Sequence, residues 1–294
     1  MRQQVAERYS WNNSEEAAQG GATIDRPPFV IGSVASEQRL SRLTRTVEAE
    51  IIPRLVLAGR AAAERRSAPA VPGPTAEDVA ELAGIILAKD ASIASAYAQA
   101  MHARGMSVEA LYLDLLAPAA RRLGDLWDAD RADFVEVTIG LGRLQQVLRQ
   151  LGPDFHAEAT GRSHGRRALI VSAPGEQHTF GQVMVAEFFC RAGWSVWRGL
   201  GESTDTLVDL VRNEWFAIVG FSVGCDGRLE RLASAIRAIR RASRNRTIGV
   251  MVGGPIFIEH PELAALVGAD ATAADARQAT VQAETMLTLL ARLG

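Results

Sequence analysis

The sequence is poor in cysteine and contains no long uninterrupted apolar run. Only 2 of the 294 residues are cysteine, which is too few for a disulfide framework, and their spacing is not that of a zinc site. No apolar stretch is long enough to cross a bilayer, so we expect no membrane-spanning segment. Met1 is followed by polar residues rather than by the apolar core of a secretion signal. These absences favour a cytoplasmic protein.

An excess of positive charge is also missing. Lys and Arg total 32 against 34 Asp and Glu, and the net charge of −2 argues against strong autonomous binding to nucleic acid. An arginine cluster could still contact phosphate, although a solvated helix face is the simpler interpretation, so direct nucleic-acid contact stays open. The cluster consists of Arg237, Arg240, Arg241, Arg244 and Arg246.

The chain is long enough for about two domains, and its first part has little periodicity. Residues 1–35 are rich in Gln, Asn, Gly, Glu and Ser, which predicts a disordered N-terminal segment. Residues 36–74 begin with leucine and isoleucine at helical spacing, which predicts a helix bent at Pro53. The same stretch ends in a proline-rich linker.

Residues 75–152 carry apolar side chains at intervals of three and four, which is typical of helices packed on one side. Thr75 can cap the first helix together with Asp78. Pro118 is expected to kink a later helix. We therefore predict a four-helix bundle that forms a cap domain. Its apolar stripes are Val79, Leu82, Ile86 and Ile93; then Leu111, Leu115, Leu116, Leu123 and Leu126; and finally Phe134, Val137, Leu141, Leu144, Leu148 and Leu151.

Residues 165–294 alternate between short apolar runs and amphipathic stretches. This alternation predicts an α/β domain with a five-stranded parallel sheet in the flavodoxin-like (Rossmann-type) order, covered by helices on both faces. The expected strands are 168–173, 195–200, 218–223, 249–253 and a weak fifth near 270–274, and helices are expected to begin near Gly181, Thr204, Gly227, Pro261 and Asp275.

One histidine stands in a glycine-rich loop directly after the first predicted strand. His178 lies three residues before Gly181, Ser222 follows Gly181 after 40 intervening residues, and Gly253-Gly254 follows Gly224 after a further 28 intervening residues. Each piece alone is an ordinary loop or turn feature. All three follow the carboxyl end of a predicted strand, which is the edge where open α/β sheets bind ligands. Together they predict one binding site.

This pattern resembles the base-off, His-on cobalamin-binding module, in which Asp-x-His-x-x-Gly, Ser-x-Leu and Gly-Gly share one pocket. The resemblance implies that His178 is the lower cobalt ligand and that Glu176 orients its imidazole. It also implies that Gly181, Ser222 and the Gly253-Gly254 pair make room for the nucleotide tail.

The chain departs from the pattern at two positions. Glu176 replaces Asp, and its extra methylene can carry the carboxylate away from the imidazole. Gly224 replaces Leu, and two consequences stay open: one wall of the tail tunnel is more open, or the tail sits differently.

The segment that ends at Trp127 resembles the bundle of cobalamin-dependent regulators and corrinoid proteins, in which a Trp packs above the corrin ring. An aromatic core plug is the alternative interpretation of Trp127. Photoreceptors of this class that hold adenosylcobalamin carry a Glu-His pair where this chain has Val137 and Thr138. The upper ligand is therefore left open between the hydroxo or aquo form and the adenosyl form, and the missing pair fits a small ligand.

Residues 130–145, 174–181 and 220–225 resemble cobalamin-binding antirepressors of photosystem genes, the AerR/PpaA type. The resemblance extends from about residue 36 to the C-terminus. It implies a light-responsive, non-enzymatic regulator, a photoreceptor that binds a DNA-binding repressor of the PpsR/CrtJ type and modulates photosynthesis gene transcription.

Two other functions fit the same fold. One is a corrinoid carrier subunit of a methyltransferase, and the other is a sensor that binds haem, as related sensor domains do. The segment ahead of the bundle favours the regulator, because a carrier has no need of it and a regulator can use it as a partner-binding arm.

Overall fold

The structure is a computed structural model, and it describes most of the chain from residue 73 onward. His178 and Cys225 lie outside the described residues, as do the predictions for residues 1–35 and for the helix bent at Pro53. The described residues fall in one compact unit, residues 70–294. They are 73–88, 90–157, 165–176, 179–199, 202–224 and 226–293.

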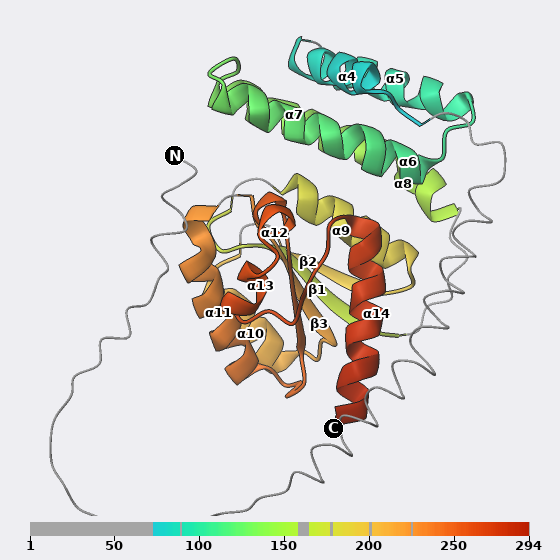
Figure 1. Cartoon of the computed structure of the whole chain (residues 1–294). Coiled ribbons are helices and arrows are strands. Elements are labelled where there is room, and N and C mark those ends of the chain that lie inside the picture. Colours follow the sequence, from blue (N-terminus) through green and yellow to red (C-terminus); the bar gives the residue numbers. More distant parts are fainter. Residues whose placement is uncertain are drawn as a thin grey trace, which may run out of the picture. The chain divides into compact units, whose positions relative to one another are not determined.

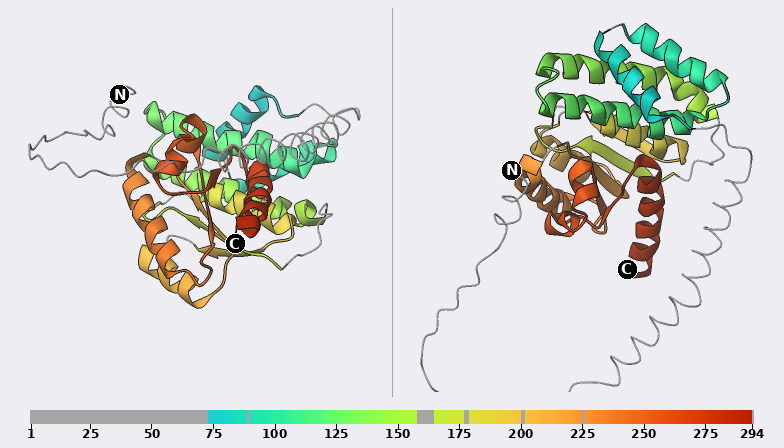
Figure 2. Two further views of the ribbon diagram at one scale, coloured as in Figure 1. Left: turned by 60° about the horizontal axis from the view of Figure 1, so that its bottom comes forward. Right: turned by 45° about the horizontal axis from the view of Figure 1, so that its top comes forward.

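Four helical rods form the predicted bundle, which is seen side by side in cyan to green in the right-hand view of Figure 2. The third rod is continuous, although its helical type changes along its length. Labels follow Figure 1. The rods are α4 (Ala76–Ala88), α5 (Ala91–Ala103), the α6 (Val108–Ala110), η2 (Leu111–Leu116) and α7 (Ala117–Asp128) rod, and α8 (Phe134–Ala157).

The first helix begins where the sequence predicts. The backbone N–H of Thr75 donates to the Asp78 carboxylate at 2.7 Å, and the backbone N–H of Asp78 donates to the Thr75 hydroxyl at 3.2 Å. These reciprocal bonds satisfy amide groups that a helix start leaves without partners, which confirms the cap at Thr75.

The irregularity expected at Pro118 is a π-helical turn just before it. Segment η2 is π-helical, and the backbone N–H of Ala117 donates to the carbonyl of Tyr112, five residues earlier. Proline lacks an N–H and clashes with the preceding turn of a regular α-helix. A wider turn relaxes that clash, so the rod continues through Pro118.

Two residues of the predicted apolar stripes lie on the surface instead. Ile93 is 44% exposed and Phe134 is 47% exposed. Asp90 caps α5 by accepting a hydrogen bond from the N–H of Ser92, so a new helix starts there and Ile93 no longer continues the stripe of α4. Phe134 is the first residue of α8, and its ring contacts Trp127.

The second half contains the predicted parallel sheet, with strand order β2-β1-β3-β4-β5. This is the flavodoxin-like order, and the fold-class prediction is confirmed. The elements are β1 (Arg167–Ser172), α9 (Phe180–Arg191), β2 (Ser195–Gly199), α10 (Thr204–Asn213), β3 (Ile218–Ser222), η3 (Asp226–Arg228), α11 (Leu229–Ala242), β4 (Gly249–Gly253), α12 (Pro255–Glu259), α13 (Leu263–Leu266), β5 (Ala271–Thr272) and α14 (Ala276–Leu293).

The helix expected near Pro261 is the short α13, which begins at Leu263, and a further helix, α12, precedes it. Pro255 occupies the first turn of α12, where its fixed φ and missing N–H suit a helix start. Pro261 lies instead in the turn that separates α12 from α13.

Helices cover both faces of the sheet (Figure 1). Helices α10 and α11 pack on one face, where Leu207 and Ile236 belong to one apolar cluster with Val219 of β3. Helices α9 and α14 pack on the other face, where Phe189 and Ala283 join Ile170 of β1.

Helix α9 belongs to two hydrophobic cores at once. Ala186 and Phe189 pack toward the sheet. Phe180, Met184 and Phe188 belong to the core of the bundle, where the Phe188 ring lies 4.9 Å from that of Phe155. The bundle and the sheet therefore pack on the two sides of a single helix.

Phe188 holds this shared helix in the core of the bundle. We expect Phe188→Ala to lower the free energy of unfolding by about 3–5 kcal/mol, because it empties a buried site in that core. Phe134→Ala removes the same ring from an exposed position and is expected to cost less than about 1.5 kcal/mol. Urea unfolding of both variants measures the difference, and equal losses would contradict the shared core.

Candidate functional site

The carboxyl edge of the sheet brings together residues that are distant in sequence. In the strand register Ser222 pairs with Ser172 on one side and with Gly253 on the other. The backbone continues this pairing past the strands, since the N–H of Val223 donates to the carbonyl of Gly253 at 2.9 Å. Ser222 ends β3 and Gly253 ends β4, so the two residues are neighbours at the carboxyl edge. The strand order reverses between β1 and β3, next to Ser222.

Gly181 lies against the same serine. It is the second residue of α9, and a Cβ atom placed on it would come within 3.0 Å of the Ser222 hydroxyl oxygen. The structure therefore brings Gly181, Ser222 and Gly253 to one edge.

The two adjacent glycines differ in what they require. Gly254 has φ +131°, and a Cβ there would overlap the carbonyl oxygen of Val223, so its backbone tolerates only glycine. A Cβ on Gly253 would meet nothing within 4 Å. Gly254 is needed by the fold, whereas Gly253 leaves open space at the edge.

Glu176 lies in the loop after β1 and is 5% exposed. Its carboxylate accepts a hydrogen bond from the N–H of Gly224 at 2.9 Å and lies 4.0 Å from the guanidinium of Arg228. The Glu176 carboxylate lies beside Gly224, which is itself exposed, so the more open wall expected at Gly224 stays a prediction. Whether Glu176 orients the imidazole stays a prediction, since His178 lies outside the described residues.

The residue after the histidine is tied to the bundle. The side-chain amide of Gln145, on α8, donates to the Thr179 hydroxyl at 2.7 Å. Glu176 and Thr179 flank residues 177 and 178 in sequence. The two ends of this short segment are therefore bonded to different parts of the molecule.

Sequence reasoning missed a buried amide below this loop. Gln182 is 1% exposed, accepts a hydrogen bond from the Ser172 hydroxyl at 2.8 Å, and donates to the carbonyls of Ile170 and Gly199. It joins the carboxyl ends of β1 and β2 next to the predicted site. The signal that could have found it is a glutamine on the core-facing side of an apolar helix.

Trp127 lies near the end of α7 and is 44% exposed, so the interpretation of Trp127 as a core plug is wrong. Its ring meets that of Phe134 edge-on at 6.3 Å, and both side chains line an open pocket of about 430 Å³. The pocket lies over the turn between α7 and α8. Its lining consists of Trp127, Asp130, Arg131, Ala132, Asp133, Phe134 and Glu136.

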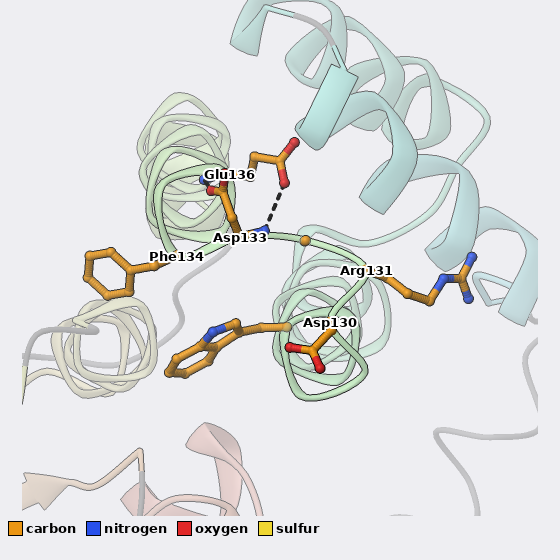
Figure 3. A pocket seen from close by; sticks show the side chains of 7 residues that line it. Asp130, Arg131, Asp133, Phe134 and Glu136 are labelled. Carbon is orange, nitrogen blue, oxygen red and sulfur yellow. Dashed lines mark hydrogen bonds between the residues drawn. The ribbon is translucent and has the colours of Figure 1, made fainter.

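The polar side of this pocket is held by its own backbone. The N–H of Asp133 donates to the Glu136 carboxylate, and the N–H of Glu136 donates to the Asp133 carboxylate, both at 2.8 Å. Figure 3 shows the first of these bonds, with the Phe134 ring pointing away from Glu136. The aromatic side of the pocket thus stays separate from the charged side.

Apolar exposure continues along the first turns of α8. Val135 is 60% exposed and Ile139 is 48% exposed. Val137 is buried in the bundle core, and the Thr138 hydroxyl donates to the carbonyl of Phe134. Neither Val137 nor Thr138 presents a metal-binding group beside Trp127.

Other candidate ligands among the described residues have structural partners. His156 Nε2 lies 2.6 Å from the Glu187 carboxylate, and His102 Nδ1 lies 2.8 Å from the carbonyl of Met106. Within the described part of the chain, no group of three or more His, Cys, Asp or Glu side chains could hold a metal ion. In the same residues, no helix has the length and apolarity needed to span a membrane.

The arginine cluster on and after α11 serves the ends of secondary structure elements. Guanidinium groups of the cluster donate to backbone carbonyls, and one also pairs with Asp270 at 2.8 Å. The carbonyl acceptors are those of Ile248 and Gly268 for Arg240, Arg237 for Arg241, Asn213 for Arg244 and Arg241 for Arg246. Direct contact with nucleic acid stays untested.

Comparison of the chain with known proteins identifies its family. A B12 binding domain matches residues 166–283, and a second B12 binding domain matches residues 80–151. An uncharacterized 20.5 kDa protein in the bchF-crtJ intergenic region of Rhodobacter capsulatus is 33% identical over 163 residues, which are 55% of this chain and 84% of that protein. The chain belongs to the B12-binding domain family, in agreement with its resemblance to AerR/PpaA-type proteins.

The solved structure of the Methanosarcina barkeri monomethylamine corrinoid protein has the same fold. Its TM-score is 0.61, and the alignment covers 72% of this chain and 98% of that chain at 16% identity. At this identity the likeness shows the fold alone.

The residues present fit a corrinoid. Gly253 leaves the sheet edge without side-chain atoms nearby, as close approach of a ligand to the backbone requires. Trp127 and Phe134 expose aromatic surface on the bundle, which can cover an apolar ring. A corrinoid-binding role is therefore supported.

Alanine substitutions at Gly254 and Gly253 are expected to differ in their effect on the free energy of unfolding. We expect Gly254→Ala to lower the free energy of unfolding by about 3 kcal/mol or more, since it adds strain at a positive φ and an overlap with Val223. Gly253→Ala, the matched control, is expected to change it by less than about 0.5 kcal/mol. Denaturant unfolding measures both variants without any cofactor, and a stable Gly254→Ala protein would contradict the assigned backbone.

Proposed function

We propose that this protein is a light-responsive cobalamin-binding regulator, without catalytic activity of its own, that binds a DNA-binding repressor and modulates its control of photosynthesis genes. The observation that carries the proposal is the position of α9, which follows the histidine loop and packs into the cores of both B12-binding domain matches.

In this proposal the chain holds the cofactor from the sheet edge and covers it from the bundle. His178 ligates cobalt from below, while Gly181, Ser222, Gly253 and Gly254 surround the nucleotide tail. Bound cobalamin supplies a cobalt centre whose upper ligand can be lost or exchanged in light. Trp127 covers that upper side, and the absence of a metal-binding group at Val137 and Thr138 favours a small upper ligand.

A change at the upper face can reach the protein surface through the bundle. Trp127 and Phe134 are in ring contact at the turn before α8, and Gln145, farther along α8, is bonded to Thr179 in the histidine loop. If the packing of Trp127 against Phe134 changes, the start of α8 moves with it, and α8 is hydrogen-bonded to Thr179 through Gln145. For this to be a switch, the two cofactor states must differ in affinity for two conformations of the protein.

The partner is a repressor of the PpsR/CrtJ type. Support comes from the sequence resemblance and from the relative in the bchF-crtJ region, whose name records its gene neighbourhood. We assign residues 1–74 to partner binding as an arm, because they precede both B12 binding domain matches in the sequence.

His178→Ala tests the cofactor role directly. We expect at least about a tenfold loss of affinity for hydroxocobalamin, together with a changed cobalt absorption spectrum, because a neutral imidazole is lost as ligand. His260→Ala is the control, since this exposed histidine lies near Glu262 in the turn after α12. Unchanged affinity and spectrum in His178→Ala would overturn the ligand assignment, and tight binding of haem in place of cobalamin would favour the haem sensor.

Illumination tests the regulatory role. The full chain loaded with hydroxocobalamin or with adenosylcobalamin is expected to change its absorption spectrum in light. Its affinity for a purified PpsR/CrtJ-type repressor should change with it, by a factor set by the differential affinity of the two states. Equal repressor affinity in light and dark would contradict the switch. Transfer of the methyl group from the methylated cofactor to an acceptor thiolate, leaving cobalt(I) and catalysed by an added methyltransferase, would favour the carrier.

A further inference from the structure

We infer that Glu176 and Gly224 form a matched pair that fastens the loop after β1 to the loop after β3. Glu176 is then a positioning residue for the segment that carries His178. The inference rests on the proposed function only for its effect on the cofactor, because the pair itself is a property of the protein alone.

The buried carboxylate is the first half of the argument. The side chain of Glu176 is 3% exposed, so its negative charge has lost almost all contact with water. Such burial is costly unless hydrogen bonds and opposite charge replace the water. The N–H of Gly224 supplies a hydrogen bond at 2.9 Å, and Arg228 supplies a guanidinium at 4.0 Å.

The absent side chain at Gly224 is the second half. A Cβ atom built there would lie 2.8 Å from the Glu176 Oε2 atom and 3.2 Å from its Cδ atom. The φ angle of Gly224 is outside the left-handed region, so its conformation does not require glycine. A Cβ atom at residue 224 would therefore displace the Glu176 carboxylate from its present position.

The turn before Glu176 packs against the start of α11. Gly175 has φ +83°, and a Cβ on it would lie 3.1 Å from the Arg228 Nη1 atom and 3.7 Å from the Arg231 Nη1 atom. The backbone N–H of Glu176 closes the turn by donating to the carbonyl of Ala173 at 2.8 Å. The loop is thus held by its backbone, by its carboxylate and by the start of α11.

The two departures from the cobalamin pattern therefore compensate each other. A longer acid at 176 reaches the backbone of residue 224 only if that residue has no side chain. Aspartate would withdraw the carboxylate by about one carbon–carbon bond, roughly 1.5 Å, and would leave room for a side chain at 224. Glu176 and Gly224 therefore depend on each other. We expect that replacing only one of them disturbs the contact between the two loops.

A double-mutant cycle tests the pair. Its variants are Gly224→Ala, Glu176→Asp and the two combined, and each is read in three ways: urea unfolding without cofactor, hydroxocobalamin affinity, and the cobalt absorption spectrum. We expect each single change to weaken affinity and to alter the spectrum, and the double variant to bind more tightly than Gly224→Ala. Coupling is expected at about threefold or more in the binding and the unfolding equilibrium constants.

Gly227→Ala, alone and combined with Glu176→Asp, is the matched control. A Cβ on Gly227 meets nothing within 4 Å, so the free-energy changes caused by Gly227→Ala and Glu176→Asp should add without coupling. Independent effects of Gly224→Ala and Glu176→Asp on unfolding would overturn the pair. Coupling in unfolding without any binding of cobalamin would keep the pair and overturn the proposed function, while coupling in unfolding without any spectral change would overturn the positioning role.

Discussion

The constraint on which the rest of the structure depends is that one helix serves two hydrophobic cores. Helix α9 turns Phe180, Met184 and Phe188 into the bundle and Ala186 and Phe189 toward the sheet. Neither half can shift along this helix without exposing apolar surface, because buried side chains on both sides are close-packed. The start of α9 is therefore placed by both halves at once.

The carboxyl edge of the sheet gains its shape from backbone geometry more than from large side chains. Parallel pairing sets Ser222 beside Gly253, and the unusual backbone of Gly254 turns the chain directly into α12. Two buried polar side chains behind this edge have hydrogen-bond partners, as is usual for buried groups in native proteins. Gln182 bonds to the ends of two strands, and Glu176 bonds to the next loop.

Much of the fold was predictable from the sequence, because the spacing of apolar residues reflects which side chains are buried, and glycine and proline mark where elements end. The alternation of apolar runs after residue 165 predicts the parallel sheet, and short connections with right-handed crossovers leave the flavodoxin-like order as the favoured one. The failures at Ile93 and Phe134 have different causes. At Ile93 helical spacing was extended across a helix start, where a new helix has its own phase, whereas Phe134 is the first residue of α8 and is exposed there. The partner of Glu176 was also missed, because a hydrogen bond across 48 residues leaves no spacing in the sequence.

By itself the sequence determined the order of elements, the edge on which Ser222 and Gly253 fall, and the family to which the chain belongs. These follow from local patterns, since side-chain periodicity and glycine placement are written along the chain. Only the tertiary structure decided that Trp127 is exposed, that Gly254 but not Gly253 is needed by the backbone, and that Glu176 and Gly224 act together. Such facts depend on distances between segments that are far apart in sequence, and packing alone sets those distances.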